Sequence, residues 1–152
     1  MTLTCGFSTA RDLFEKLQRD AAALDAEVTS DRLFNFVVTG YSLIDWIKND
    51  PSVPASAKVA SAIEGLYSDT WLKVCGDLAT ASKHFRLTSR PPVTTSAKAS
   101  RGYGVGRYGR GGYGVGEESV MLQLNDGTSF HCLELARGVV ASWQAFFTAH
   151  GV

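Results

Sequence analysis

The chain has 152 residues, 45% of them hydrophobic, which suffices for one buried core in a domain of ordinary size. Its 15 Lys and Arg balance its 15 Asp and Glu, so no overall field draws it to nucleic acid or an anionic membrane. No segment approaches the ~18 consecutive apolar residues of a membrane span, and the first residues lack a basic stretch followed by an apolar one. We therefore expect a single cytoplasmic domain over 1–152 with no membrane association.

The three cysteines, Cys5, Cys75 and Cys132, are scattered along the chain without a CxxC motif or a Cys/His ligand spacing. This pattern argues against both a disulfide framework and a zinc site. We expect free thiols in a reducing compartment, no metal site and no cofactor.

Apolar residues at helical spacing predict four helices and a weaker fifth. Ser8-Thr9 and Thr29-Ser30-Asp31 are capping clusters before the first two helices, Asp69 is a candidate N-cap of the fourth, and Gly151 follows the last. The predicted helices span 9–27, 31–48, 56–67 (the weak one), 69–85 and 133–150.

The segment 93–118 has a different composition, with small polar residues followed by glycine, tyrosine and arginine, and its Tyr-Gly-Val-Gly block occurs at both 103–106 and 113–116. Such glycine density predicts an extended or mobile loop rather than a helix. Residues 119–132 then read as a β-hairpin with Asp126-Gly127 at its tight turn. The predicted fold class is mainly α, a helical bundle of four to five helices with one inserted β-hairpin and a Gly-rich loop.

Polar residues gather near the end of the helix predicted at 69–85. Asp77, Lys83 and His84 lie within about two turns of one another, and Asp77 and His84 share a helix face about 10.5 Å apart. An imidazole at such a place serves as a general acid or base, or contacts phosphate. The alternative is that Lys83 and His84 only satisfy the carbonyl groups at the helix end.

A second group lies on the helix predicted at 31–48, where Tyr41 and Asp45 are an i, i+4 pair. If this face meets the face that carries Asp77 and His84, a small polar site forms between the two helices. The alternative is that Asp45 anchors Trp46 or a neighbouring backbone amide.

The Gly-rich loop alternates arginines with aromatic rings, a pattern that offers guanidinium groups to phosphates and rings to bases. These nucleic-acid-binding candidates are Arg101, Tyr103, Arg107, Tyr108, Arg110 and Tyr113. The same composition also describes a loop that folds over the hairpin or lines an oligomer interface.

The segments FNFVVTGYSLIDWI, CGDLATASKHFRL and LELARGVVASWQAFFTAHG, together with the Gly-rich loop, resemble a group of uncharacterised bacterial helical-bundle proteins that includes products of mobile elements, over about 31–151. The Lys83-His84 helix end is similar to the HEPN-domain superfamily, whose members are ribonucleases or non-catalytic binding modules. The superfamily's catalytic signature has an Arg four to six residues before the His. Here that stretch runs from Asp77 to Thr80 without an Arg, so the resemblance implies a dimeric binding module.

We therefore expect an interaction or ligand-binding module that forms a homodimer, with a protein or a nucleic acid as a further partner. One alternative is an RNA-processing enzyme or toxin in which His84 is the acid/base, Asp45 or Asp77 orients it, and the loop arginines hold phosphate. Another is a nucleic-acid binder without chemistry, which uses those arginines alone.

Overall fold

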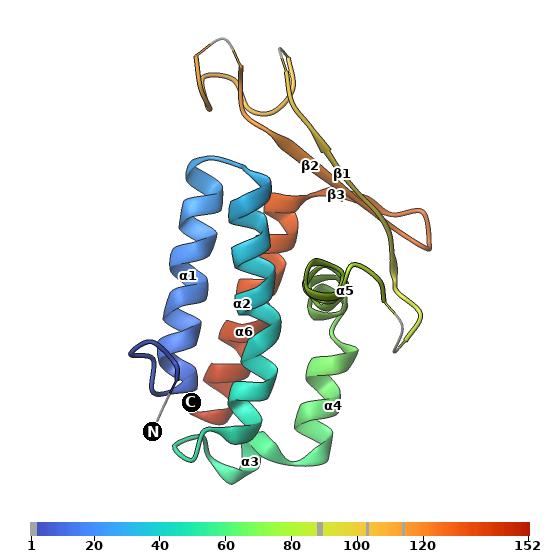
Figure 1. Ribbon diagram of the computed structural model, residues 1–152. Coiled ribbons are helices and arrows are strands. Elements are labelled where there is room, and N and C mark those ends of the chain that lie inside the picture. The colour runs from blue at the N-terminus through green and yellow to red at the C-terminus, as the bar shows by residue number, and fades with distance from the viewer. Residues whose placement is uncertain (1–2, 88–89, 103, 114) are drawn as a thin grey trace.

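The computed structural model describes residues 3–87, 90–102, 104–113 and 115–152. Within these residues it contains six helices and three strands (Figure 1). In chain order they are α1 (Ala10–Ala26), α2 (Ser30–Asn49), α3 (Ala55–Lys58), α4 (Ala60–Ser68), α5 (Thr70–His84), β1 (Thr94–Ser100), β2 (Ser119–Leu124), β3 (Ser129–His131) and α6 (Cys132–His150).

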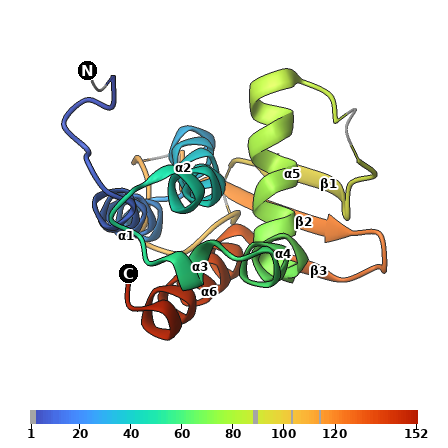
Figure 2. The same ribbon diagram turned by 90° about the horizontal axis from the view of Figure 1, so that it is seen from below.

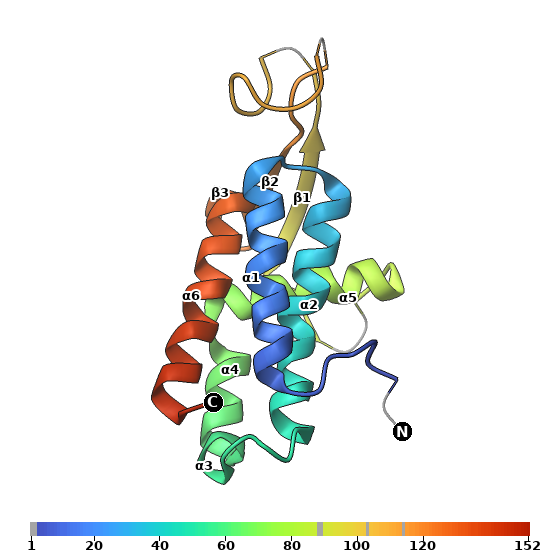
Figure 3. The ribbon, with the colours of Figure 1, turned by 90° about the vertical axis from the view of Figure 1, so that its left-hand side faces the viewer.

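The long helices α1, α2 and α6 run side by side, and α5 crosses them (Figures 1 and 3). Seen from below, α5 projects away from the three long helices, and the sheet lies behind it (Figure 2). Trp143 of α6 lies fully buried among these helices, and its Nε1–H donates to the carbonyl of Gly40 in α2 at 2.9 Å. The mainly helical fold is thus confirmed.

Local signals set the helix starts. Thr9 caps α1 in a capping box with Asp12, and Thr29 and Asp69 cap α2 and α5 through their side chains, as the sequence predicts. The weak prediction at 56–67 corresponds to two short helices, because Val59 between them has an extended backbone.

The sheet is antiparallel with the order β1-β2-β3, and the predicted hairpin forms β2 and β3 around a turn in which Gly127 has φ +89°. The prediction of a loop over the whole of 93–118 is wrong, because Thr94–Ser100 is a strand that pairs with β2. Its small, polar side chains carry no strand signal. The position of β1 is set instead by its pairing with β2 and by the backbone N–H groups of Val93 and Thr94, which donate to the Asp77 side chain.

Two helical glycines lie in opposite environments. A Cβ at Gly138 of α6 would come within 2.2 Å of the Trp71 indole, whereas a Cβ at Gly65 of α4 would meet nothing within 4 Å. We expect Gly138→Ala to lower the free energy of unfolding by about 1–3 kcal/mol through overpacking. Gly65→Ala, the matched control, should raise it by about 0.5–1 kcal/mol because alanine favours the helix. Urea unfolding of both variants tests this; equal effects of one sign would contradict it.

Candidate functional site

A groove of about 390 Å³ lies between α2 and α5 and contains four of the five acid/base candidates. Tyr41 and Asp45 come from α2, and Lys83 and His84 come from the last turn of α5. The two helix faces meet as the sequence analysis required. We call this feature the α2–α5 groove; its lining is Phe34, Val38, Tyr41, Ser42, Asp45, Ala79, Thr80, Lys83 and His84.

Gly76 sets the close approach of the two helices. A Cβ at this position would lie 2.5 Å from the Tyr41 ring, so only glycine lets the ring approach α5 this closely. Tyr41 is therefore partly buried, and this burial raises the pKa of its phenol above the ordinary value, an effect that the nearby Arg90 guanidinium opposes. The phenol thus remains a neutral hydrogen-bonding group at physiological pH.

Asp77, the fifth candidate, does not line this groove. Its carboxylate is buried, accepts hydrogen bonds from the backbone N–H groups of Val93 and Thr94 at 2.9 Å each, and lies 2.7 Å from Nη2 of Arg90. The chain after α5 folds back over Asp77 and covers its carboxylate. Because buried N–H groups need acceptors, Asp77 fastens the start of β1 to α5.

The charged groups of the groove are only partly neutralised within the protein. Asp45 lies 3.8 Å from Nζ of Lys48, whereas Lys83 and His84 are exposed and form no ion pair with any described residue. The structure thus brings Tyr41, Asp45, Lys83 and His84 to one groove without a carboxylate that holds the imidazole.

A second hollow of about 250 Å³ adjoins the first, and Phe34 lines both. It is bounded by Leu33 and Val37 of α2, by Leu78 and Ser82 of α5, and by Ala97, Ala99 and Val120 of the sheet. Phe34 is 47% exposed although it is a large apolar side chain. Sequence reasoning missed this hollow because it did not predict β1.

The arginines of the Gly-rich loop form ion pairs and hydrogen bonds with other residues of the same chain. Arg107 pairs with the buried Glu117 through Nε at 2.9 Å and Nη2 at 2.8 Å, and Nη1 lies 3.4 Å from Asp25. Arg101 pairs with Glu118 at 3.3 Å, and Arg110 donates to the carbonyl of Ala26 at 3.3 Å. These contacts dock the loop on the α1–α2 connection.

Of the aromatic candidates in this loop, Tyr108 and Tyr113 are fully exposed, and Tyr103 lies outside the described residues. Val105 N–H donates to the carbonyl of Gly102 and Val115 N–H donates to the carbonyl of Gly112, both at 3.2 Å. The two bonds lie ten residues apart, in step with the repeat of the Tyr-Gly-Val-Gly block.

Glu117 is the residue of this loop that sequence reasoning missed. Its side chain is 1% exposed, and it also accepts from the backbone N–H of Val28 at 3.0 Å. Hydrogen bonds from Arg107, chiefly, and from Val28 lower the pKa of Glu117 to about 2 despite its burial. A glutamate within a glycine-rich segment carries no sequence signal of burial.

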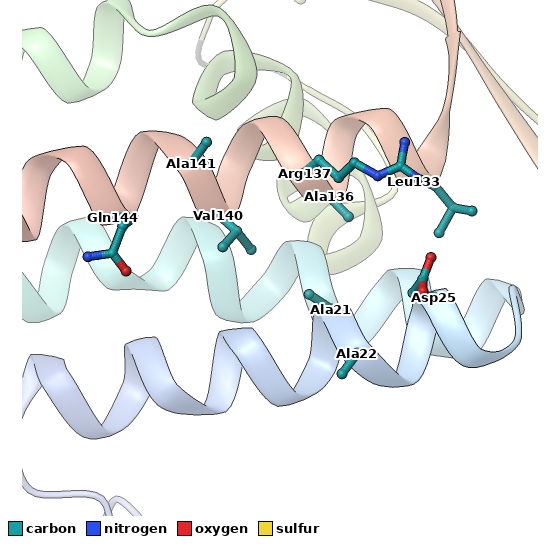
Figure 4. A pocket seen from close by; sticks show the side chains of 9 residues that line it. All are labelled: Ala21, Ala22, Asp25, Leu133, Ala136, Arg137, Val140, Ala141 and Gln144. Carbon is teal, nitrogen blue, oxygen red and sulfur yellow. The ribbon is translucent and has the colours of Figure 1, made fainter.

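A further hollow, of about 580 Å³, lies between α1 and α6 (Figure 4). Its walls are mostly small apolar side chains, with Asp25 and Arg137 near one end and Gln144 near the other. It offers apolar area but few converging polar groups, which are what orients a ligand.

The described residues contain no cluster of three His, Cys, Asp or Glu side chains that would hold a metal ion, and none of their helices is long and apolar enough to cross a membrane. Cys75 and Cys132 are buried free thiols, and burial raises the pKa of both, that of Cys132 to about 11. Neither thiol is therefore an activated nucleophile.

Comparison of the chain with protein-family models, with curated proteins and with solved structures finds no match.

Proposed function

We propose that this protein is an interaction module that binds its ligand in the α2–α5 groove. The observation that carries the proposal is the combination of an exposed aromatic ring, Phe34, with the hydrogen-bonding and charged groups of Tyr41, Lys83 and His84 in one concave surface. Such a combination of apolar area and a few polar groups is typical of ligand sites. The HEPN-like character of the bundle and its homodimer stay predictions within this proposal.

Two features favour binding over RNA chemistry. Asp77, one of the two carboxylates that would orient His84 in a nuclease, is committed to Arg90 and to two backbone N–H groups. Arg107, the loop arginine with the most contacts, is engaged by Glu117 and Asp25, so contact with phosphate would compete with these pairs.

An NMR screen tests the proposal although the ligand is unidentified. The probe is a library of small organic fragments, added in mixtures to ¹⁵N-labelled protein. We expect the amide shifts of hits to change at Phe34, Tyr41 and Lys83, because binding energy concentrates in concave sites with polar groups. Val140 in the α1–α6 hollow is the internal control. Hits that map to Val140 instead, or a library without hits, would contradict the proposal.

A further inference from the structure

Among the residues that the structure describes, no strand pairs with the outer edge of β1. The sheet order places β1 at an edge, and five of its seven residues are exposed. An edge strand presents unpaired backbone N–H and C=O groups, and so it is a template for pairing with another strand. β3, at the other edge, has only three residues.

The ladder shows which backbone groups face outward. Leu124 N–H donates to Thr128 on the β3 side, whereas Asn125 N–H donates to Val93 on the β1 side, both at 2.8 Å. Because backbone groups alternate along a strand, odd-numbered residues of β2 bond to β1. Met121 pairs with Lys98 and Ser119 with Ser100, which leaves the backbone groups of Ala97 and Ala99 directed to the open edge.

The side chains of the same two residues line the hollow at Phe34. Ala97 and Ala99 lie opposite Leu122 and Val120, which are buried, so their methyl groups are on the face of the sheet that covers the helices. Because their side chains are single methyl groups, they leave room in the hollow for side chains of a ligand. A strand added beside β1 would project alternate side chains from the same face, into the hollow and the adjoining α2–α5 groove.

The charge at the end of α5 indicates the composition of the added strand. Lys83 and His84 line the groove and Arg86 follows α5, and among the residues that the structure describes none of the three has an ion-pair partner. The acidic group in the groove, Asp45, has Lys48 at 3.8 Å. A carboxylate on the incoming strand would therefore find positive charge near Phe34.

We infer that the ligand of the groove is an extended peptide segment of a partner protein, which adds as a strand to the edge of β1. Its backbone pairs with Ala97 and Ala99, an apolar side chain packs on Phe34, and an acidic side chain faces Lys83. Main-chain pairing supplies affinity in this type of recognition, and the pockets for alternate side chains supply specificity. The inference rests on the proposed function and specifies its ligand.

The test uses random 12-residue peptides displayed on phage and selected on the immobilised full chain. We expect enriched peptides to combine apolar and acidic residues. For the tightest synthetic peptide, Ala97→Pro should weaken binding at least tenfold, because proline removes an edge donor. The variant should still fold, because an edge strand tolerates proline at a position whose N–H faces outward. Lys98→Ala is the control, since its side chain is on the other face of the sheet and binding should change less than twofold.

Amide hydrogen exchange gives a second measurement on the unmodified protein. Saturating peptide should slow exchange at Ala97 and Ala99 at least tenfold, while Lys98, whose N–H belongs to the β1–β2 ladder, changes little. If Phe34→Ala weakens binding but Ala97→Pro and the exchange rates do not respond, strand addition is wrong and groove binding survives. If neither variant weakens binding, both proposals fail. A selection without binding peptides overturns the peptide ligand, and the fragment screen then decides on the groove.

Discussion

Replacing Arg107 with alanine is expected to lower the free energy of unfolding by about 2–3 kcal/mol at neutral pH, because it leaves the carboxylate of Glu117 buried without its cation. The value lies toward the lower end for a buried pair because the Arg107 side chain is 32% exposed and because Glu117 keeps the hydrogen bond from Val28. Arg110→Ala is the matched control. It removes one exposed contact to a carbonyl group and should cost less than about 0.5 kcal/mol.

The same ion pair predicts the acid response of the protein. The pKa of Glu117 is lowered from 4.5 to about 2 in the folded state, so its contribution to stability is fully present above pH 4.5 and is lost as the pH falls toward 2. The contribution amounts to about 3 kcal/mol. Urea unfolding between pH 6 and pH 2.5 should show a steeper loss of stability for the wild type than for Arg107→Ala. Parallel curves for the two proteins would show that Glu117 is not held by Arg107.

The largest effect is expected in the core. Trp143→Ala should lower the free energy of unfolding by about 3–5 kcal/mol, because it empties a fully buried site in contact range of Phe146 and Phe147. Since domains of this size are stable by roughly 5–15 kcal/mol in total, this loss is a large fraction of the stability of the protein.

Trp143→Phe separates the two roles of this side chain. Phenylalanine keeps most of the apolar volume but loses the Nε1–H that donates to Gly40, so we expect a loss of about 1–3 kcal/mol, smaller than that of the alanine variant. Thermal and urea unfolding give both values. A cost below 1 kcal/mol for Trp143→Ala would contradict the placement of this tryptophan among the long helices.

The helices were predictable because local signals coincide with the pattern of buried residues. Thr9, Thr29 and Asp69 cap their helices as their sequence context indicates, and Asp126-Gly127 turns the hairpin. β1 was not predictable, because its alanines, serines and threonines lack the alternation of a half-buried strand and its partner is distant in sequence.

The candidate site also contains some residues that the sequence indicates and others whose roles it does not show. The i, i+4 pair of Tyr41 and Asp45 and the polar end of the next long helix at Lys83 and His84 were candidates from the sequence. The packing of Tyr41 on Gly76 brings the two helices together. The roles of Asp77 and Glu117 depend on chain segments that return from elsewhere. Spacing along the chain cannot show that a carboxylate is already engaged.

The pairing of loop arginines with carboxylates also explains how a glycine-rich, basic segment is kept in place on a neutral protein. Arg101 and Glu118 lie in the same segment, and Glu118 further accepts from the backbone N–H of Ser30 at the start of α2. Opposite charges and hydrogen bonds thus connect the loop to the end of the helical bundle where α1 leads into α2 (Figure 1).

The most direct test of the central claim is the dissociation constant of one ligand, the tightest peptide or fragment found above, for the wild type, Phe34→Ala and Val140→Ala. Binding in the α2–α5 groove predicts a loss of about tenfold or more for Phe34→Ala, since about 1.4 kcal/mol of apolar contact is removed. Val140→Ala, in the α1–α6 hollow, should leave the dissociation constant within twofold of the wild-type value. The reverse result, a loss confined to Val140→Ala, would place the binding surface between α1 and α6 and contradict the proposed function.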